Sequence, residues 1–148
     1  ADYWSTKWPE PLRTEDGSVA RALDALNNGP GHVEALQRRD EYAAVISFSH
    51  FVPRQELNPE KRYLIPACLA KAVGSVYLRD RVAKLRPHLH VFGHTHFGYD
   101  MELEGTRYLQ AALGTPQERA FGGSIVALGE FPVLAPEPCK VWDATEGW

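Results

Sequence analysis

The spacing of apolar residues predicts a helix near the start of the chain. Val19, Leu23 and Leu26 fall on one helical face, as in a helix that buries one side. Ser18 stands just before this pattern and is a plausible N-cap. The Asn, Gly and Pro residues at 27–31 interrupt the pattern, so the helix is expected to end there.

Two further helices follow from the same kind of pattern. A short one is expected at 33–39. Ser75 can cap a longer one that ends before Pro87. Three apolar residues share a face of the longer helix: Leu78, Val82 and Leu85. The residues at 1–17 and 130–148 mix prolines and tryptophans with charges, and we expect irregular structure in both segments.

Two short apolar runs predict buried strands. Residues 43–49, AAVISFS, are rich in β-branched and aromatic side chains and run straight into His50. Residues 89–92, LHVF, lead through a glycine to His94 and His96. If the two strands are neighbours, the three histidine rings can meet at one edge of the sheet.

Residues 99–111 predict a hairpin, because apolar residues alternate up to the turn sequence Glu104-Gly105 and the chain then returns. Strands mixed with helices, and strand ends that release polar residues into loops, indicate an α/β fold class. The whole chain, 1–148, suits a single domain.

Composition narrows the classes of function. With 44% hydrophobic residues, 24% charged residues and a net charge of −3, the chain gives no electrostatic signal for nucleic acid. No apolar run approaches the roughly 20 residues that span a bilayer, and no secretory signal opens the chain. We therefore expect a soluble intracellular protein, in a compartment that the sequence leaves open.

Two details of composition bear on the context of the chain. Cys68 and Cys139 are far apart and lack C-x-x-C spacing, so we interpret them as free thiols in a reducing compartment, with a disulfide as the alternative. The chain starts at Ala1 and its only methionine is Met101. We therefore expect it to be a piece of a longer protein.

The histidines suggest a metal site. Neutral imidazole is a good ligand for zinc, iron, manganese or nickel. A lone H-x-H is a weak signal, but two strand-end histidine sites in one small domain strengthen it. His88 and His90 lie before or within a strand, and we interpret them as packed or surface residues. His32 lies at an expected helix start, and we assign it no role.

The segments VISFSHFVPR, at 45–54, and HVFGHTHFGYD, at 90–100, together resemble the C-terminal half of a calcineurin-like metallophosphoesterase. Lys7-Trp8-Pro9 is also similar to that family. The resemblance implies an α/β fold, as the C-terminal portion of a four-layer α/β/β/α sandwich. It implies strand-end loops that hold two ions of Mn, Fe or Zn about 4 Å apart.

The same resemblance implies a role for individual residues. His50 and His94 would ligate one ion and His96 the other, with Gly93 permitting a tight turn between strand and loop. The ions would polarise a phosphoryl oxygen of a phosphate-ester substrate and activate a bridging water for attack. Arg54 would contact the substrate phosphate through its planar guanidinium, or would form a surface salt bridge.

The acidic motifs of that family, D-x-H, G-D-x-x-D and G-N-H-E/D, do not occur in the chain. Three neutral imidazoles can hold one ion, but two divalent ions so close together need a bridging negative charge. We therefore expect at most one ion, no catalytic residue and no activity in this chain alone. The N-terminal half of the same protein, or a partner chain, would complete the domain and cover the open face of its sheet. The alternative is a non-catalytic metal-binding or structural module within a larger assembly.

Overall fold

The computed structural model describes residues 5–60, 70–117 and 140–147. Cys68 and Cys139, and the part of the C-terminal segment from 130 to 139, lie outside the described residues. The elements follow in this order: α1 (Ser18–Ala25), α2 (Pro30–Gln37), the 3-10 turn η1 (Arg39–Glu41), β1 (Ile46–Phe48), the 3-10 turn η2 (Gln55–Leu57), α3 (Val76–Leu85), β2 (Leu89–Val91), β3 (Tyr99–Leu103) and β4 (Thr106–Gln110).

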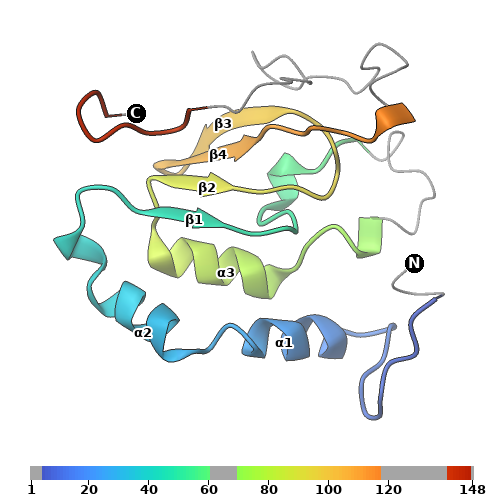
Figure 1. The fold of residues 1–148 in the computed structure, drawn as a ribbon. Coiled ribbons are helices and arrows are strands. Elements are labelled where there is room, and N and C mark those ends of the chain that lie inside the picture. Colours follow the sequence, from blue (N-terminus) through green and yellow to red (C-terminus); the bar gives the residue numbers. More distant parts are fainter. Residues whose placement is uncertain (1–4, 61–69, 118–139, 148) are drawn as a thin grey trace.

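The strands form a sheet in the order β1-β2-β4-β3 (Figure 1). β1, β2 and β4 run parallel, and only β3 is antiparallel, to β4. Helices mixed with strands in an open sheet are the α/β class that the sequence predicts. The described residues form one sheet, so the four-layer sandwich stays a prediction. Because the three parallel strands end on the same side, the loops that follow them meet at one edge.

The helices lie on one side of the sheet, with α3 next to the strands and α1 and α2 beyond it (Figure 1). Both outer helices contact α3. The prediction for α3 is confirmed, because the hydroxyl of Ser75 accepts the Leu78 N–H at 3.2 Å and caps its start. Its C-cap, Arg86, has a left-handed φ of 49° just before Pro87. No helix in the described ranges is long and apolar enough to cross a membrane.

The outer helices begin at different residues from those predicted. Ser18 is not the N-cap but the first residue of α1, and its hydroxyl accepts the Arg13 N–H at 2.8 Å. The carboxylate of Asp16 accepts the Ser18 N–H, so the turn forms one residue earlier. α2 begins at Pro30 rather than at 33, because proline has no N–H to lose at a helix start and its φ already suits a helix.

The strand predicted at 43–49 is present, but it is shorter than the apolar run and the prediction that it is buried is wrong. β1 covers three residues, and Ile46 and Phe48 are exposed, with 85% of Phe48 open to solvent. The reason is position: β1 is an edge strand, and no described residue covers these two side chains. The apolar composition of the run could not reveal its place in the sheet. β2, a central strand, is buried as predicted.

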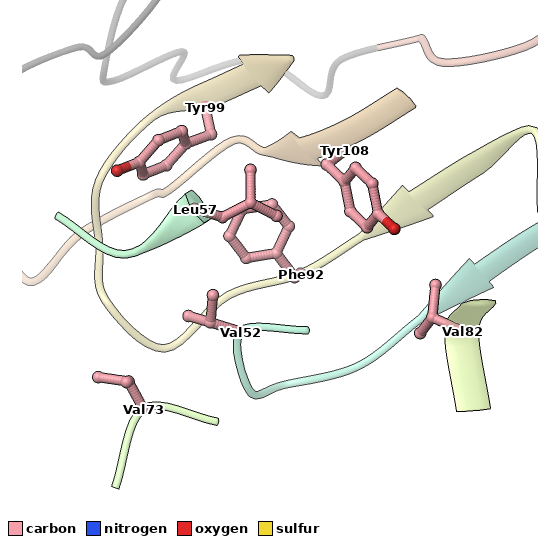
Figure 2. Packing of buried hydrophobic residues seen from close by; sticks show 7 residues of the cluster. All are labelled: Val52, Leu57, Val73, Val82, Phe92, Tyr99 and Tyr108. Atoms are coloured by element: carbon pink, nitrogen blue, oxygen red, sulfur yellow. The ribbon is translucent and has the colours of Figure 1, made fainter. Parts of the chain in front are cut away.

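The main cluster of buried apolar residues lies beside η2, α3 and the strand ends (Figure 2). Its members are Val52, Leu57, Val73, Val82, Phe92, Tyr99 and Tyr108. The Val52 N–H donates to the Val73 carbonyl at 2.8 Å. Gly74 then passes so close to the Val52 carbonyl that a side chain on Gly74 would collide with it. The segment that follows His50 is thereby fixed to the start of α3.

The predicted hairpin is confirmed. β3 and β4 pair in register from Tyr99 opposite Gln110 to Leu103 opposite Thr106. Both turn residues have positive φ, 52° for Glu104 and 77° for Gly105, as a two-residue type I′ turn requires. In the described parts of the two ends, 5–17 and 140–147, the structure contains no helix or strand.

Candidate metal centre

The ends of β1 and β2 bring His50 and His94 into direct contact. Nε2 of His50 lies 3.0 Å from Nδ1 of His94. Their ring centroids are 5.0 Å apart and the ring planes are inclined at 78°. The loops that carry them are also joined through the backbone, because the Gly93 N–H donates to the His50 carbonyl at 3.1 Å. The first part of the predicted ligand set is therefore assembled by the sheet.

The left-handed φ values of this loop belong to His94, at 77°, and His96, at 61°, and not to Gly93. A Cβ on Gly93 would lie 3.4 Å from the His50 carbonyl oxygen, an ordinary van der Waals contact. The role of Gly93 in a tight turn therefore stays a prediction. Non-glycine residues rarely adopt positive φ, and such strain gathers at functional sites.

His96 lies on the same loop but faces a neighbouring hollow. His94 and His96 both line this hollow, of about 400 Å³, together with residues 110–115 after β4. The structure thus joins His50 to His94 directly and leaves His96 beside the pair. Within the described ranges, no three His, Cys, Asp or Glu side chains form a cluster that could hold a metal ion.

The loop with the two histidines is attached at both ends to β4. At its start, the Phe92 N–H donates to the Leu109 carbonyl at 2.9 Å. At its end, Tyr99 pairs with Gln110 in the β3–β4 ladder. The buried amide of Gln110 also donates to the hydroxyl of Thr95, at 3.1 Å, between the two histidines. One strand therefore fixes the whole loop.

Phe51 is a residue of the site that the sequence analysis missed. Its ring packs at an edge against His50, with centroids 5.2 Å apart, and against His94 at 5.0 Å. Phe51 is itself 38% exposed, so its ring contacts the two histidines without enclosing them. Its position directly after His50 was the available signal, although adjacency in sequence alone does not show where a ring points.

Arg54 makes two ion pairs. Nη2 lies 2.7 Å from Oε1 of Glu56, and Nη1 lies 2.7 Å from Oε2 of Glu104 in the hairpin turn. These carboxylates raise the pKa of Arg54, and the guanidinium lowers the pKa of Glu56 to about 2. Of the two predicted roles, this geometry matches the salt bridge. Contact with a substrate phosphate stays a prediction.

The other histidines are packed away from the pair. Nδ1 of His88 accepts the Val45 N–H at 3.0 Å. His90 is 1% exposed and bonded to two serines, and burial lowers its pKa to about 4, so the ring is neutral near pH 7. His32 lies within α2, and burial also lowers its pKa. The interpretation of His88 and His90 as packed residues agrees with these contacts.

No family model, curated protein or solved structure matches the chain. The resemblance to calcineurin-like metallophosphoesterases therefore stays a prediction, and function has to be argued from the geometry of the site.

Proposed function

We propose that His50 and His94 hold one divalent ion, Zn, Mn or Fe, as the histidine part of a metal-dependent phosphoesterase site. The observation that carries the proposal is the 3.0 Å contact between Nε2 of His50 and Nδ1 of His94 at the end of two parallel strands. A second support is the left-handed backbone of His94 and His96, a strained conformation that is found preferentially at functional sites.

The distance between the two nitrogen atoms fits a shared ion. A zinc–imidazole bond is about 2.0–2.1 Å long, so two imidazole nitrogens on one tetrahedral zinc stand roughly 3.3–3.4 Å apart. Nε2 of His50 and Nδ1 of His94 are 3.0 Å apart, a few tenths of an ångström closer. In the metal-free chain one ring donates a hydrogen bond to the other. Binding of an ion needs that proton to move to the other nitrogen of its ring, with little movement of the loops.

A bound ion would polarise a phosphate ester and lower the pKa of a water molecule that attacks phosphorus. The residues of this chain would hold the ion through His50 and His94, and the Phe51 ring would pack against both imidazoles. His96 lines the adjoining hollow and would serve a second ion or the substrate phosphate. The N-terminal half of the protein, or a partner chain, would supply the acidic ligands.

The second candidate is a non-catalytic metal-binding module. It is favoured by Arg54, the one cation assigned to the substrate, because its guanidinium is engaged by Glu56 and Glu104. A phosphate would have to displace at least one of these carboxylates before it could form a bidentate contact.

Metal titration of the full chain tests the proposal. We expect at most one equivalent of Zn²⁺ or Mn²⁺ after dialysis, lost in His50→Ala and His94→Ala but kept in His32→Ala, the control on α2. His96→Ala should keep the ion. Two tightly held ions per chain, or binding unaffected by His94→Ala, would contradict the assignment of ligands.

Two measurements separate the candidates. We expect negligible hydrolysis of p-nitrophenyl phosphate by the chain alone. We also expect inorganic phosphate to bind only the metal-loaded chain, more weakly in His96→Ala. Absence of phosphate binding to a loaded chain would favour the non-catalytic module. Metal-dependent turnover that disappears in His94→Ala would show instead that this chain is active without an acidic half.

A further inference from the structure

A series of hydrogen bonds runs from the buried side chain of His90 to the backbone beside His50. On β2, His90 is 1% exposed. Its Nδ1 lies 2.7 Å from Oγ of Ser47, and its Nε2 lies 3.0 Å from Oγ of Ser49. The hydroxyl of Ser49 donates onward to the carbonyl of Phe51 at 2.6 Å. This series of hydrogen bonds therefore crosses from β2 to β1 and ends at the residue directly after His50.

Chemistry determines which group donates and which accepts in each of these hydrogen bonds. A carbonyl oxygen only accepts, so the Ser49 proton must point at Phe51. The oxygen of Ser49 then accepts from Nε2–H of His90, which leaves Nδ1 without a proton, and Ser47 donates to it. His90 thus has one tautomer. It does not draw the proton from Ser49, so the pair is not an activated serine nucleophile.

We infer that His90 is a positioning residue for the His50–His94 pair. Through Ser49 it holds the Phe51 carbonyl, and the Phe51 ring contacts both His50 and His94. Ser49 is also held by its own N–H, which donates to the Val91 carbonyl at 3.0 Å. Partners outside the first coordination shell orient ligands and strengthen binding of metals. The inference concerns the ligand pair of the proposed function, and its geometric part can be tested without metal.

A role of His90 in the core alone would have different consequences from a role in positioning the His50–His94 pair. Variants of the two serines help to distinguish these roles. Ser47 and Ser49 bind the same ring, one on each nitrogen. Only Ser49 is joined to Phe51. If neither His90 nor Ser49 positions the pair, loss of either serine should have the same effect, and if Ser49 alone positions it, His90→Leu should leave His50 and His94 unchanged. If His90 positions the pair, only the loss of Ser49 should change His50 and His94.

The experiment compares Ser47→Ala with Ser49→Ala in the full metal-free chain. Long-range ¹H–¹⁵N spectra report the ring nitrogens of each histidine. We expect Ser49→Ala to shift the His50 and His94 signals and Ser47→Ala to leave them in place, although both lower the unfolding midpoint by similar amounts. Ser49→Cys, which keeps the size of the side chain and bonds only weakly, replaces Ser49→Ala if that variant does not fold.

Affinity for Zn²⁺ gives a second readout. We expect about a tenfold loss in Ser49→Ala, with Ser47→Ala within about twofold of the original chain. His90→Gln, whose amide can accept from one serine and donate to the other, should retain most of the affinity that His90→Leu loses. Equal shifts in the two serine variants, or no rescue by glutamine, would overturn the inference. A chain that binds no Zn²⁺ would refute the proposed function, and the metal-free spectra would still decide the role of His90.

Discussion

Nε2 of His50 lies 3.0 Å from Nδ1 of His94, although 44 positions separate them in sequence. Parallel strands need a crossover connection between them, and here it includes η2 and α3. The contact between the two rings therefore depends on how that connection packs, and substitutions well away from the histidines should alter the stability of the arrangement.

Burial of His90 makes the stability of the fold depend on pH. Its folded pKa is about 4, below the unfolded value of about 6.5. The contribution of neutral His90 to the free energy of unfolding is fully present above pH 6.5. It is lost as the pH falls toward 4, because His90 binds a proton more tightly in the unfolded chain than in the folded one. From pH 7 to 4 the loss attributable to His90 should reach about 3 kcal/mol at most.

Chemical denaturation of the original chain and His90→Gln at several pH values checks this. Carboxylates titrate in both proteins, so the difference between the two curves isolates His90. The difference in unfolding free energy between the two proteins should change with pH between 6.5 and 4. If the two curves of unfolding free energy against pH run parallel, protonation of His90 does not destabilise the fold.

Gly74 should not tolerate a side chain. A Cβ there would collide with the Val52 carbonyl, so we expect Gly74→Ala to destabilise the fold by about 1–3 kcal/mol through forced movement of the backbone. Gly31 in α2 is the matched control, because nothing lies within 4 Å of its Cβ position. Gly31→Ala should stabilise by about 0.5–1 kcal/mol through helix propensity. Thermal unfolding measures both, and equal effects would contradict the packing described for Val52.

The ion pair between Asp24 and Arg81 should hold α1 to α3. Arg81 meets both oxygens of Asp24, at 2.9 and 2.8 Å, and the two side chains are 23% and 15% exposed for Asp24 and Arg81. Asp24→Asn should cost about 1–3 kcal/mol, because Arg81 loses its charged partner in a partly buried place.

Asp40→Asn is the control for that prediction. Asp40 and Arg86 also form an ion pair, at 3.1 Å, but their side chains are 84% and 67% exposed. An exposed pair contributes little, so the change in unfolding free energy should stay below about 1 kcal/mol. Equal losses in the two variants would mean that burial does not strengthen the Asp24 pair.

Local signals in the sequence predicted much of the fold. Ser75 before an apolar stripe gave α3, and Glu104-Gly105 gave the hairpin turn, because a cap and a type I′ turn depend on neighbouring residues only. The exposure of Phe48 could not be predicted this way. It depends on which strand lies at the edge of the sheet, and that is a property of the whole chain.

The candidate site was likewise predictable from the sequence only in part. Strand-end position was enough to predict that His50 and His94 meet. It was not enough to predict that the positive φ values of the loop belong to His94 and His96, because backbone angles at a strand end depend on how the loop packs. The link from His90 through Ser49 to Phe51 needs the register of β1 against β2, which no spacing along the chain reveals.

The attachment of both ends of the histidine loop to β4 would affect how quickly the proposed site exchanges a ligand. The Phe92 N–H bonds to Leu109 and Tyr99 pairs with Gln110, two neighbouring positions of one strand. A loop so fastened has no hinge about which to swing outward as a lid. Entry and departure of an ion or phosphate would depend on rotation of the histidine side chains, which is far faster than the opening of a hinged segment.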